Sequence, residues 1–375
     1  MKFSAYKTDV SLIKELVFFA LCLIVVDSEA SSYTITNLGT LGSDNEKGSS
    51  WAYDINEKGQ IVGNSSIGGI TYSFLYENGV MTNIAPQEKS YNTANAINNH
   101  GEIVGQKNIN VTGANYEAYL YKNGQMIGLG TNKLDYSYAT DINDNGQIVG
   151  VSGTGNGSLT KGFLYQNGVM SDIGSLGGVY TNPESINNSG QVVGYSQNSK
   201  RGTEAFLFEN GKMTGIGSLV SNANDSRAKS INEDGSIAGS TQEYYYSPRQ
   251  GFLIQNNQVS DFDSHNYPFS MAYDINNLNE VVGISGNSIP EAFVYKDGKL
   301  NFLYSLLIGD VTGWTELRYA NAINDKGQIV GMGIFNGLER AFLLTEIPTA
   351  PTIWLIGSGL IAFLGIRKLK FLNNM

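Results

Sequence analysis

The chain has 375 residues, of which 15% are charged, and its formal net charge is −10. Because binding to a nucleic-acid backbone requires a basic surface, this charge balance argues against a nucleic-acid-binding protein. One cysteine and two histidines exclude a disulfide framework and any cysteine-based zinc or iron–sulfur site. The 45 glycines and the 11% aromatic content are typical of many short strands joined by tight turns.

Residues 1–30 have the pattern of a secretory signal peptide. Three lysines precede an apolar run from Leu16 to Val26, which is too short to span a bilayer as a helix of about 20 residues. Small residues at positions −3 and −1 place the cleavage site between Ala30 and Ser31. The sequence therefore predicts export of the mature protein; the alternative is a buried N-terminal helix.

Residues 31–346 are organised by an internal repeat. The motif Ile-Asn-x-x-Gly-x-(Ile/Val)-(Val/Ala)-Gly occurs seven times at intervals of 42 to 48 residues, with Asn279 replacing the first glycine of the sixth copy. Its isoleucines are Ile55, Ile97, Ile142, Ile186, Ile231, Ile275 and Ile323. The asparagine side chain can accept a downstream N–H and the glycine can adopt positive φ, so each copy predicts a turn between two strands. Asn279 fits this turn because asparagine tolerates positive φ better than other non-glycine residues.

Each copy is followed by a second motif, in which a small residue precedes an aromatic residue and then Leu or Val. The aromatic residues are Phe74, Tyr119, Phe163, Phe206, Phe252, Phe293 and Phe342. In six units there follows a pair of residues suited to the positive φ angles of a type I′ hairpin turn. The pairs are Asn78-Gly79, Asn123-Gly124, Asn167-Gly168, Asn210-Gly211, Asn256-Asn257 and Asp297-Gly298.

Each unit is therefore predicted to contain four short antiparallel strands. In the first unit these are Ala52–Ile55, Gln60–Asn64, Tyr72–Tyr76 and Val80–Ile84. Four-stranded repeats of about 40–50 residues are typical of the blades of a β-propeller.

The seventh unit ends after Ala341–Leu344 and lacks a fourth strand. Before the first unit, Ile35–Gly42 aligns position by position with the fourth strand of the third unit, Met170–Gly177. We expect this N-terminal segment to complete the last blade, which removes the open sheet edges of an unclosed array. The predicted fold is an all-β, seven-bladed β-propeller from about Tyr33 to Thr345, closed by the N-terminal strand.

The repeats resemble those of the HAF-repeat extracellular proteins of bacteria. The resemblance rests on Leu38–Gly42, Ser175–Gly178 and Glu204–Phe208, and it covers nearly the whole mature chain. The histidine of the family's His-Ala-Phe phrase is absent from every unit. The family implies an extracellular repeat protein and brings no established activity.

Residues 347–375 contain an apolar stretch from Ile353 to Ile366 followed by basic residues, a pattern that predicts a transient membrane anchor. The segment resembles the PEP-CTERM sorting signal of Gram-negative bacteria, with Pro-Thr-Ala-Pro in place of Pro-Glu-Pro. The matching residues are Pro348, Pro351, Trp354, Gly357, Ser358, Gly359, Arg367 and Lys368. The resemblance implies an inner-membrane sorting protease as a partner and release to the cell surface or medium; the alternative is a permanent anchor.

The connections between strands two and three of each unit vary in sequence and are expected on one face, where binding usually occurs. They include Ser65–Thr71, Lys107–Glu117, Ser152–Lys161, Ser196–Glu204 and Thr241–Gln250. In the last of these, Tyr244, Tyr245 and Tyr246 are candidates for stacking on sugars or docking a partner. The alternative for these tyrosines is packing between blades.

Two acidic patterns are weaker candidates. Asp141, Asn143 and Asn145 fit the first half of a calcium loop, but the glutamate expected eleven residues after Asp141 is Ser152, and turn chemistry explains the same pattern without a metal. Asp54, Asp141 and Asp274 share one repeat position, which Ala or Ser occupies in the other units. We interpret them as ordinary half-exposed strand residues; the alternative is a carboxylate pair for glycoside hydrolysis.

Three functional hypotheses remain. The first is an exported, non-catalytic propeller that binds a glycan or a protein partner at the cell surface or in the extracellular matrix through its variable-loop face. The second is a structural component of an exopolysaccharide or biofilm matrix. The third is a carbohydrate-active enzyme that uses loop carboxylates. No cofactor is predicted, and the sequence contains no serine-hydrolase elbow, phosphate-binding loop or His-Glu-x-x-His motif.

Overall fold

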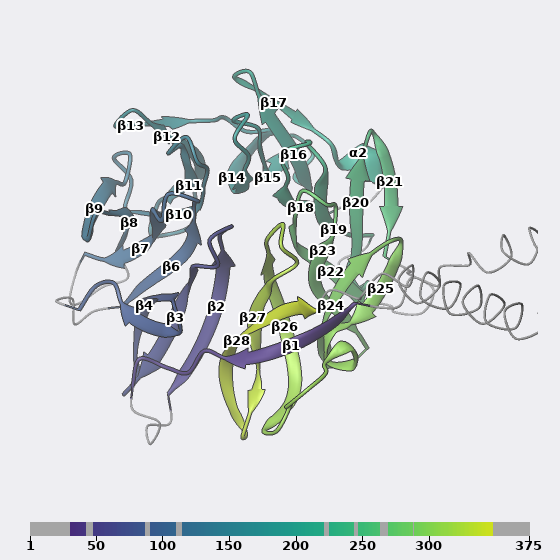
Figure 1. Ribbon diagram of the computed structural model, residues 1–375. Coiled ribbons are helices and arrows are strands. Elements are labelled where there is room, and N and C mark those ends of the chain that lie inside the picture. Colours follow the sequence, from purple (N-terminus) through teal and green to yellow (C-terminus); the bar gives the residue numbers. More distant parts are fainter. Residues whose placement is uncertain are drawn as a thin grey trace, which may run out of the picture. The chain divides into compact units, whose positions relative to one another are not determined.

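A computed structural model of the chain describes residues 31–42, 48–86, 91–109, 115–220, 225–243, 247–262, 269–287 and 289–347 (Figure 1). The predicted signal peptide, the sorting motif from Pro348 onward and the three tyrosines at 244–246 lie outside these ranges. Within them, no helix is both long enough and apolar enough to cross a membrane. The compact unit from Tyr33 to Glu346 contains the repeats.

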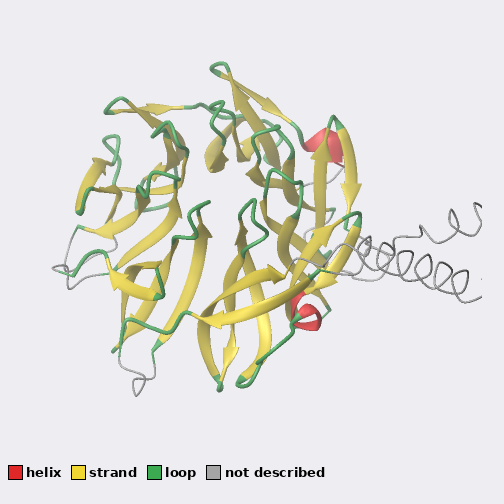
Figure 2. Cartoon of the chain, in the orientation of Figure 1, coloured by secondary structure: helices red, strands yellow, loops and turns green. Residues whose placement is uncertain are grey.

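The described residues form an all-β structure with two single-turn helices (Figure 2). The first two units comprise β2 (Ser49–Ile55), β3 (Ile61–Ile67), β4 (Ile70–Glu77), β5 (Val80–Asn83), β6 (Asn92–Ile97), β7 (Ile103–Asn108), β8 (Tyr116–Lys122) and β9 (Gln125–Gly130). The third and fourth comprise β10 (Tyr136–Ile142), β11 (Ile148–Gly153), β12 (Thr160–Gln166), β13 (Val169–Asp172), β14 (Gly177–Ile186), β15 (Val192–Asn198), β16 (Thr203–Glu209) and β17 (Lys212–Gly215).

The remaining elements continue the same pattern. After the short helix α2 (Gly217–Val220) come β18 (Asp225–Ile231), β19 (Ile237–Gln242), β20 (Gln250–Gln255), β21 (Gln258–Asp261), β22 (Phe269–Ile275), β23 (Val281–Gly286), β24 (Pro290–Lys296) and β25 (Lys299–Phe302). The 3₁₀ turn η1 (Leu303–Leu306) then leads to β26 (Trp314–Ile323), β27 (Ile329–Phe335) and β28 (Leu338–Ile347).

Consecutive strands pair in antiparallel fashion within each unit, and single parallel bridges join the third unit to the fourth and the fourth to the fifth. The sheets lie around a common centre, with the first strand of each unit innermost (Figure 1). We call β2, β6, β10, β14, β18, β22 and β26 the inner strands. The N-terminal strand β1 (Ser32–Asn37) lies in one sheet with the last three strands, in the order β1-β28-β27-β26.

The predicted turns are confirmed. All six pairs between the third and fourth strands have positive φ at both residues, for example 51° at Asn78 and 81° at Gly79. Asn279, which replaces glycine in the sixth unit, has a φ of 61°. In the first motif, Asn56 accepts hydrogen bonds from the backbone N–H groups of Lys58 and Gln60, as the turn interpretation requires.

The boundaries of the variable connections were predicted too wide. Ser65–Thr71 was expected to be a loop, but β3 extends to Ile67 and β4 begins at Ile70, so only Gly68 and Gly69 form the turn. Both glycines have positive φ, which a two-residue hairpin needs. The sequence motif located the buried part of each strand. Pairing with the neighbouring strand extends each strand beyond that buried part.

Every inner strand contains a β-bulge at the same place. In β2 the register with β3 shifts between Ala52 and Asp54, so Tyr53 is the additional residue. The equivalent additional residues are Asn95, Thr140, Glu184, Lys229, Tyr273 and Asn321. A bulge interrupts the alternation of side chains between the two faces of a strand. It thereby allows two consecutive residues, such as Tyr53 and Asp54, to face the same space.

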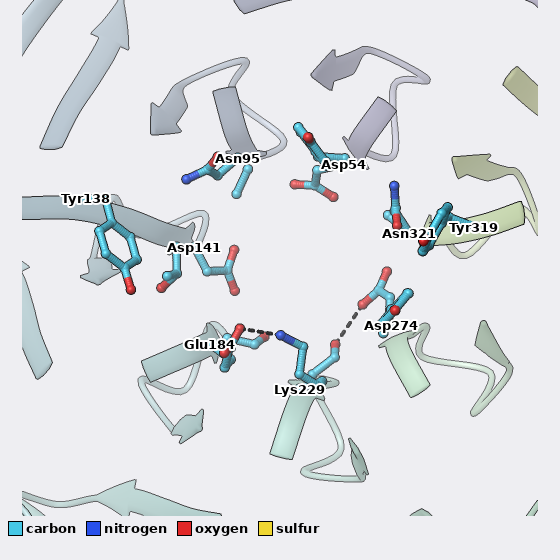
Figure 3. Close-up of a pocket in the computed structure, with 16 residues that line it drawn as sticks. Asp54, Asn95, Tyr138, Asp141, Glu184, Lys229, Asp274, Tyr319 and Asn321 are labelled. Atoms are coloured by element: carbon cyan, nitrogen blue, oxygen red, sulfur yellow. Dashed lines mark hydrogen bonds and ion pairs between the residues drawn. The ribbon is translucent and has the colours of Figure 1, made fainter. Parts of the chain in front are cut away.

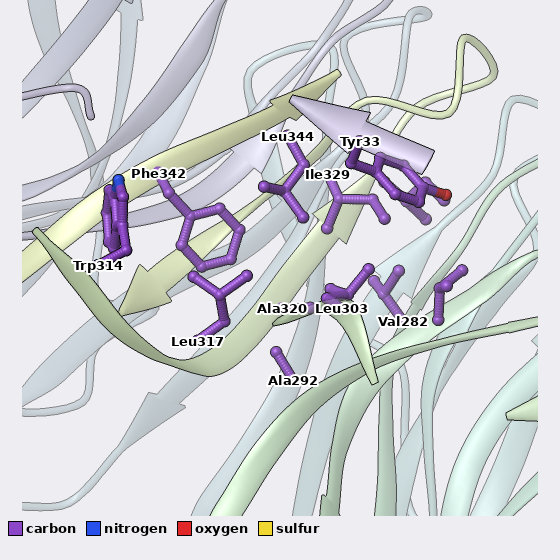
Figure 4. Packing of buried hydrophobic residues seen from close by; sticks show 12 residues of the cluster. Tyr33, Val282, Ala292, Leu303, Trp314, Leu317, Ala320, Ile329, Phe342 and Leu344 are labelled. Carbon is purple, nitrogen blue, oxygen red and sulfur yellow. The ribbon is translucent and has the colours of Figure 1, made fainter. Parts of the chain in front are cut away.

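Among the described residues, the buried hydrophobic side chains form seven clusters, and each cluster joins two neighbouring units. One cluster combines Phe74 of the first unit with Val330 and Ala341 of the seventh. In another, Tyr33 of β1 packs beside Ile329 of β27 and Leu344 of β28 (Figure 4). Because Tyr33 is 1% exposed, the N-terminal strand contributes to the core rather than lying on its surface.

Candidate functional site

A central cavity of about 410 Å³ lies among the inner strands. All seven inner strands contribute to its wall (Figure 3). Its lining residues are Tyr53, Asp54, Asn95, Ala96, Tyr138, Thr140, Asp141, Glu184, Ser185, Lys229, Ser230, Tyr273, Asp274, Tyr319, Asn321 and Ala322. The bulges explain this composition, because in every unit both the additional residue and the residue after it face the cavity.

Asp54, Asp141 and Asp274 converge on this cavity from three different units (Figure 3). Each Asp also connects its own unit to the next one. Asp54 accepts the backbone N–H of Ile55 at one oxygen and that of Ile97, in the second unit, at the other, over 2.8 and 2.7 Å. The same pattern recurs where Asp141 accepts from Ile142 and Ile186, both over 2.8 Å.

Asp274 follows the same scheme with one additional partner. Its Oδ2 accepts the N–H of Ile323 in the seventh unit over 2.9 Å, and its Oδ1 accepts the hydroxyl of Ser230 in the fifth unit over 2.7 Å. All of these partners are neutral. The three carboxylates are thus held in place without a neutralising cation among these bonds.

The electrostatic consequence is a group of carboxyls that retain their protons at unusually high pH. Burial raises the pKa of Asp54 to about 8, with the charge of Asp141 the next contribution and that of Asp274 a smaller one. Burial likewise raises the pKa of Asp141 and of Asp274 to about 6, against the opposing effect of their hydrogen bonds. The repulsion that Asp141 and Asp274 exert on Asp54 shows that the three groups share one environment.

A salt bridge lies beside these carboxyls. Lys229 Nζ in the fifth unit donates to Glu184 Oε2 in the fourth over 2.7 Å (Figure 3). Among the described residues that line the cavity, Lys229 is the only basic one. Its charge is matched by Glu184, so it does not neutralise whichever of the three aspartates are ionised.

The remaining wall is aromatic and amide in character. Tyr53, Tyr138, Tyr273 and Tyr319 supply four phenol rings. Asn95 and Asn321 each donate a side-chain N–H to a backbone carbonyl of the next unit, Ala139 and Ala52 respectively, over 2.7 Å. Aromatic rings beside oriented polar groups are common in sites that bind small organic ligands.

A second cavity of about 190 Å³ lies beyond the aspartates, among the Ile-Asn-x-x-Gly turns. Here two circular series of hydrogen bonds connect the units. In the first, the Nδ2 of each motif asparagine donates to the carbonyl of the next one over 2.9 to 3.1 Å, in the order Asn56, Asn98, Asn143, Asn187, Asn232, Asn276, Asn324 and back to Asn56.

The second circular series uses the following residue of each motif. Its backbone N–H donates to the side-chain oxygen of the equivalent residue in the next unit over 2.7 to 3.2 Å. These residues are Glu57, Asn99, Asp144, Asn188, Glu233, Asn277 and Asp325. The turn end of the molecule is thus occupied by interactions within the fold. The first cavity, bounded by residues that precede the turns, is the better candidate for a ligand site.

The structure places the calcium-loop candidates within these turn contacts. Asn143 accepts from the N–H groups of Asn145 and Gln147, and the Asn145 side chain donates to the carbonyl of Asn188. Within the described residues, no group of three or more His, Cys, Asp or Glu side chains is arranged to hold a metal ion. The contacts of Asn143 are those that the turn interpretation expects, and that of Asn145 reaches the next unit; calcium stays the weaker, untested alternative.

The cavity differs from the site expected from the sequence. None of the described residues of the five variable connections lines it. Conversely, the three aspartates were interpreted as ordinary strand residues, and the structure brings them together. The available signal was the recurrence of Asp at one repeat position in three units. It did not show that the three residues, which lie 87 and 133 positions apart, meet in one cavity.

Comparisons with known proteins identify the fold and leave the function open. A family model described as a protein of unknown function, DUF3466, matches residues 125–244. No protein with a curated description matches the chain.

Among solved structures, the chain is similar to the β-propeller domain of the trilobed protease from Pyrococcus furiosus, with 10% identity over 79% of this chain and 93% of that one and a TM-score of 0.51. It is also similar to a puromycin-hydrolysing peptidase from Mycobacterium tuberculosis, with 10% identity over 85% of this chain, 55% of that one and a TM-score of 0.52. These likenesses show that the fold is a β-propeller.

Proposed function

We propose that this chain is an exported, non-catalytic β-propeller of seven blades that binds the terminal sugar of a glycan in its central cavity. Binding takes place at the cell surface or in the extracellular matrix. The observation that carries the proposal is the cavity itself: about 410 Å³, walled by four tyrosines, carboxylates and amides from all seven inner strands. Such a space suits a small hydroxylated ring, which stacks on aromatic side chains and hydrogen-bonds to carboxylates and amides.

The strand pairing supports seven blades and a closed ring. The circular series of asparagine bonds passes through all seven units, and its last member joins Asn324 to Asn56 over 3.1 Å. At the N-terminal strand, Leu38 donates its N–H to the carbonyl of Ala341 over 3.0 Å. The equivalent bond in the third unit runs from Ile173 to Gly162 over 3.1 Å, so Leu38 occupies the place of a fourth-strand residue.

The location of the cavity supports binding of a ligand from the loop side. Its lining residues precede the Ile-Asn-x-x-Gly turns along each inner strand, whereas the turn side is occupied by the two circular series of hydrogen bonds. A ligand that entered by the turns would have to displace buried bonds. Entry from the opposite side would leave both circular series of bonds intact.

The proposal is tested by probing the purified protein on a glycan array and repeating the measurement with two cavity variants. Glu184→Gln removes a charge that pairs with Lys229, and Tyr138→Ala removes one aromatic wall. Glu291→Gln, on the exposed part of β24, is the matched control. We expect both cavity variants to lose at least about tenfold in affinity for the array's best ligand, the loss typical of one polar or aromatic contact, and the control to bind as the parent does. Binding that both cavity variants retain would place the site elsewhere.

A second candidate function is glycoside hydrolysis, which the different proton affinities of Asp54 and Asp141 favour. One carboxyl protonated near neutral pH beside one that is ionised is the arrangement of a general acid and its partner. Both oxygens of each group, however, already accept backbone N–H groups. We therefore assign these carboxyls to structure and recognition. Release of reducing ends from a bound glycan, lost in Asp54→Asn, would establish the enzyme instead.

A further inference from the structure

The charge of the central cavity identifies the class of ligand more narrowly. Asp54, Asp141 and Asp274 lie around it, and the hydrogen bonds described above give them only neutral partners. The one basic side chain among the described lining residues, Lys229, is paired with Glu184 at 2.7 Å. The cavity thus presents up to three negative charges that the protein itself does not neutralise.

The carboxylates retain acceptor capacity. A carboxylate offers about four lone-pair positions, and the two backbone N–H groups at Asp54 occupy only two of them. A primary ammonium group carries three N–H donors. An ammonium group in the cavity can therefore donate to the free positions of these aspartates, directly or through a bridging water.

The four tyrosines provide a second attraction for a cationic ligand. Tyr53, Tyr138, Tyr273 and Tyr319 line the cavity. The faces of phenol rings attract cations, and the attraction increases where water is excluded. Carboxylates with aromatic rings therefore favour an organic cation over a neutral ligand.

The geometry favours an organic cation over a bare metal ion. In the part of the chain that the structure describes, no three acidic, histidine or cysteine side chains approach closely enough to hold a metal. The cavity, at about 410 Å³, also has room for a ring-sized molecule. An ammonium group does not need several ligands crowded around one point, because it forms separate hydrogen bonds of about 2.7–2.9 Å, directly or through water.

We propose that the central cavity binds a protonated primary amine carried on a sugar, that is, a glucosamine-type unit of a glycan, with its ammonium group among Asp54, Asp141 and Asp274. This inference rests on the proposed function, since it names the ligand of the same cavity. N-acetylation of the amine removes both the charge and two of its three donors, so the acetylated sugar is the natural negative control.

Ammonium binding is coupled to proton release. Near neutral pH, Asp54 is largely protonated because burial raises its pKa to about 8. A cation among the aspartates lowers these pKa values and expels the proton. The charged and titratable groups that face this space are Asp141, Asp274, Glu184, Lys229 and the four lining tyrosines, with Glu233 close enough to act on Asp141. We expect affinity to rise between pH 5 and 7 as the aspartates ionise.

The experiment is isothermal titration calorimetry of the whole protein with the glucosamine trimer and with its fully N-acetylated counterpart. We expect the amine form to bind at least about tenfold more tightly, as one charge-assisted interaction provides. At pH 6, where the sugar amine is itself protonated before binding, the binding enthalpy should vary with the ionisation enthalpy of the buffer in the sense of proton release. Asp54→Asn should remove most of that release and weaken binding of the amine by about tenfold.

Asp297→Asn is the matched control, because Asp297 lies in the hairpin turn where other units have asparagine, and it should change neither quantity. If both trimers bound equally and Glu184→Gln weakened both, the ammonium inference would be overturned, while the cavity would remain a glycan-binding site. Failure of both trimers and of every arrayed glycan to bind would overturn the proposed function as well. Displacement of the amine trimer by Ca²⁺ alone at equal concentration would assign the carboxylates to a metal instead. Because proton release is measured on the parent protein, the test does not depend on how well the variant folds.

Discussion

The repeated motif Ile-Asn-x-x-Gly-x-(Ile/Val)-(Val/Ala)-Gly has a second glycine at its end. In each unit this final glycine lies against the inner strand, next to the bulge. A Cβ atom at Gly63 would lie 2.0 Å from the carbonyl oxygen of Trp51, and the equivalent glycines in the other units meet the same obstacle at 1.8 to 2.2 Å. These glycines are Gly105, Gly150, Gly194, Gly239, Gly283 and Gly331. The bulge turns that carbonyl toward the second strand, and only a residue without a side chain fits beneath it.

Gly63→Ala is therefore expected to destabilise the protein by about 2 kcal/mol or more, because the obstacle is backbone and cannot rotate away. The measurement is chemical denaturation of the variant and the parent. Gly155→Ala is the control, since its nearest neighbour to a new Cβ is a side-chain oxygen at 3.6 Å and its φ is not positive. Equal losses in the two variants would show that the close approach at the bulge does not exist.

The pKa of Asp54 makes a prediction about pH. Its carboxyl changes from an ordinary value of 3.8 to about 8 on folding, mainly through burial. Between these pH values the folded state holds more protons than the unfolded one, so this group's contribution to stability falls as pH rises, by at most about 1.4 kcal/mol per pH unit.

Asp54→Asn removes this dependence. The melting temperature of the variant minus that of the parent should therefore increase steadily from pH 4 to pH 8, whatever its starting value. Comparing the two proteins cancels the titration of other groups, such as Asp225, whose pKa is lowered beside Arg227 and Arg249 despite its burial. A difference that stays constant over this range would mean that Asp54 ionises as it does in water.

At the scale of the structural element, a buried asparagine is one of the groups that bond each blade to its neighbour. Asn187 is 2% exposed; its Oδ1 accepts the N–H of Gln191, and its Nδ2 donates to the carbonyl of Asn232 over 3.1 Å. One side chain thus shapes its own turn and binds the next blade. The sequence motif accounted for the first role, and the structure adds the second.

Asn187→Asp keeps the acceptor and removes the donor, leaving a buried charge against the Asn232 carbonyl. We expect a loss of about 3 kcal/mol, the usual penalty for an unsatisfied buried charged group. Asn156→Asp, in an exposed loop where only the side-chain oxygen is used, should cost less than about 0.5 kcal/mol. Urea denaturation distinguishes the two, and a loss below 1 kcal/mol in Asn187→Asp would argue against the bond between blades.

At the scale of the whole molecule, the N-terminal strand β1 pairs with the last described strand, β28. Its contacts repeat those at and after the third unit's fourth strand: the Gly39 N–H donates to Asn37 Oδ1, as the Gly174 N–H does to Asp172 Oδ1. Likewise Leu41 donates to Ser65 Oγ as Leu176 does to Ser196 Oγ, both over 3.1 Å. The N-terminal segment therefore has the same local environment as a fourth strand within the chain.

Deletion of Tyr33–Gly42 should cost several kcal/mol, a large fraction of the about 5–15 kcal/mol available to a domain, because it exposes the edge of β28 and removes Tyr33 from the core. Deletion of Pro348–Met375 should leave the melting temperature nearly unchanged. A soluble, monomeric Tyr33–Gly42 deletion that melts within a few degrees of the parent would contradict closure of the ring.

Much of the fold could be predicted from the sequence by itself, because its determinants are local. The positive φ at Asn78-Gly79, the turn at Asn56 and the likeness of Ile35–Gly42 to a fourth strand each depend on residues within one short segment. Because the motif occurs seven times, each local inference applies to all seven units. Strand ends were predicted less well, since cross-strand pairing extends the strands beyond the buried stretch.

The candidate site, by contrast, was decided by the tertiary structure. Asp54, Asp141 and Asp274 are separated by 87 and 133 positions, and each has the sequence context of a half-exposed strand residue. Only the circular arrangement of the inner strands brings them to one cavity with Lys229 and Glu184. Strict alternation along a strand also predicts opposite directions for Tyr53 and Asp54, and the bulge reverses that expectation. Shared burial and mutual repulsion, which give these carboxyls their character, exist only once the blades surround a common centre.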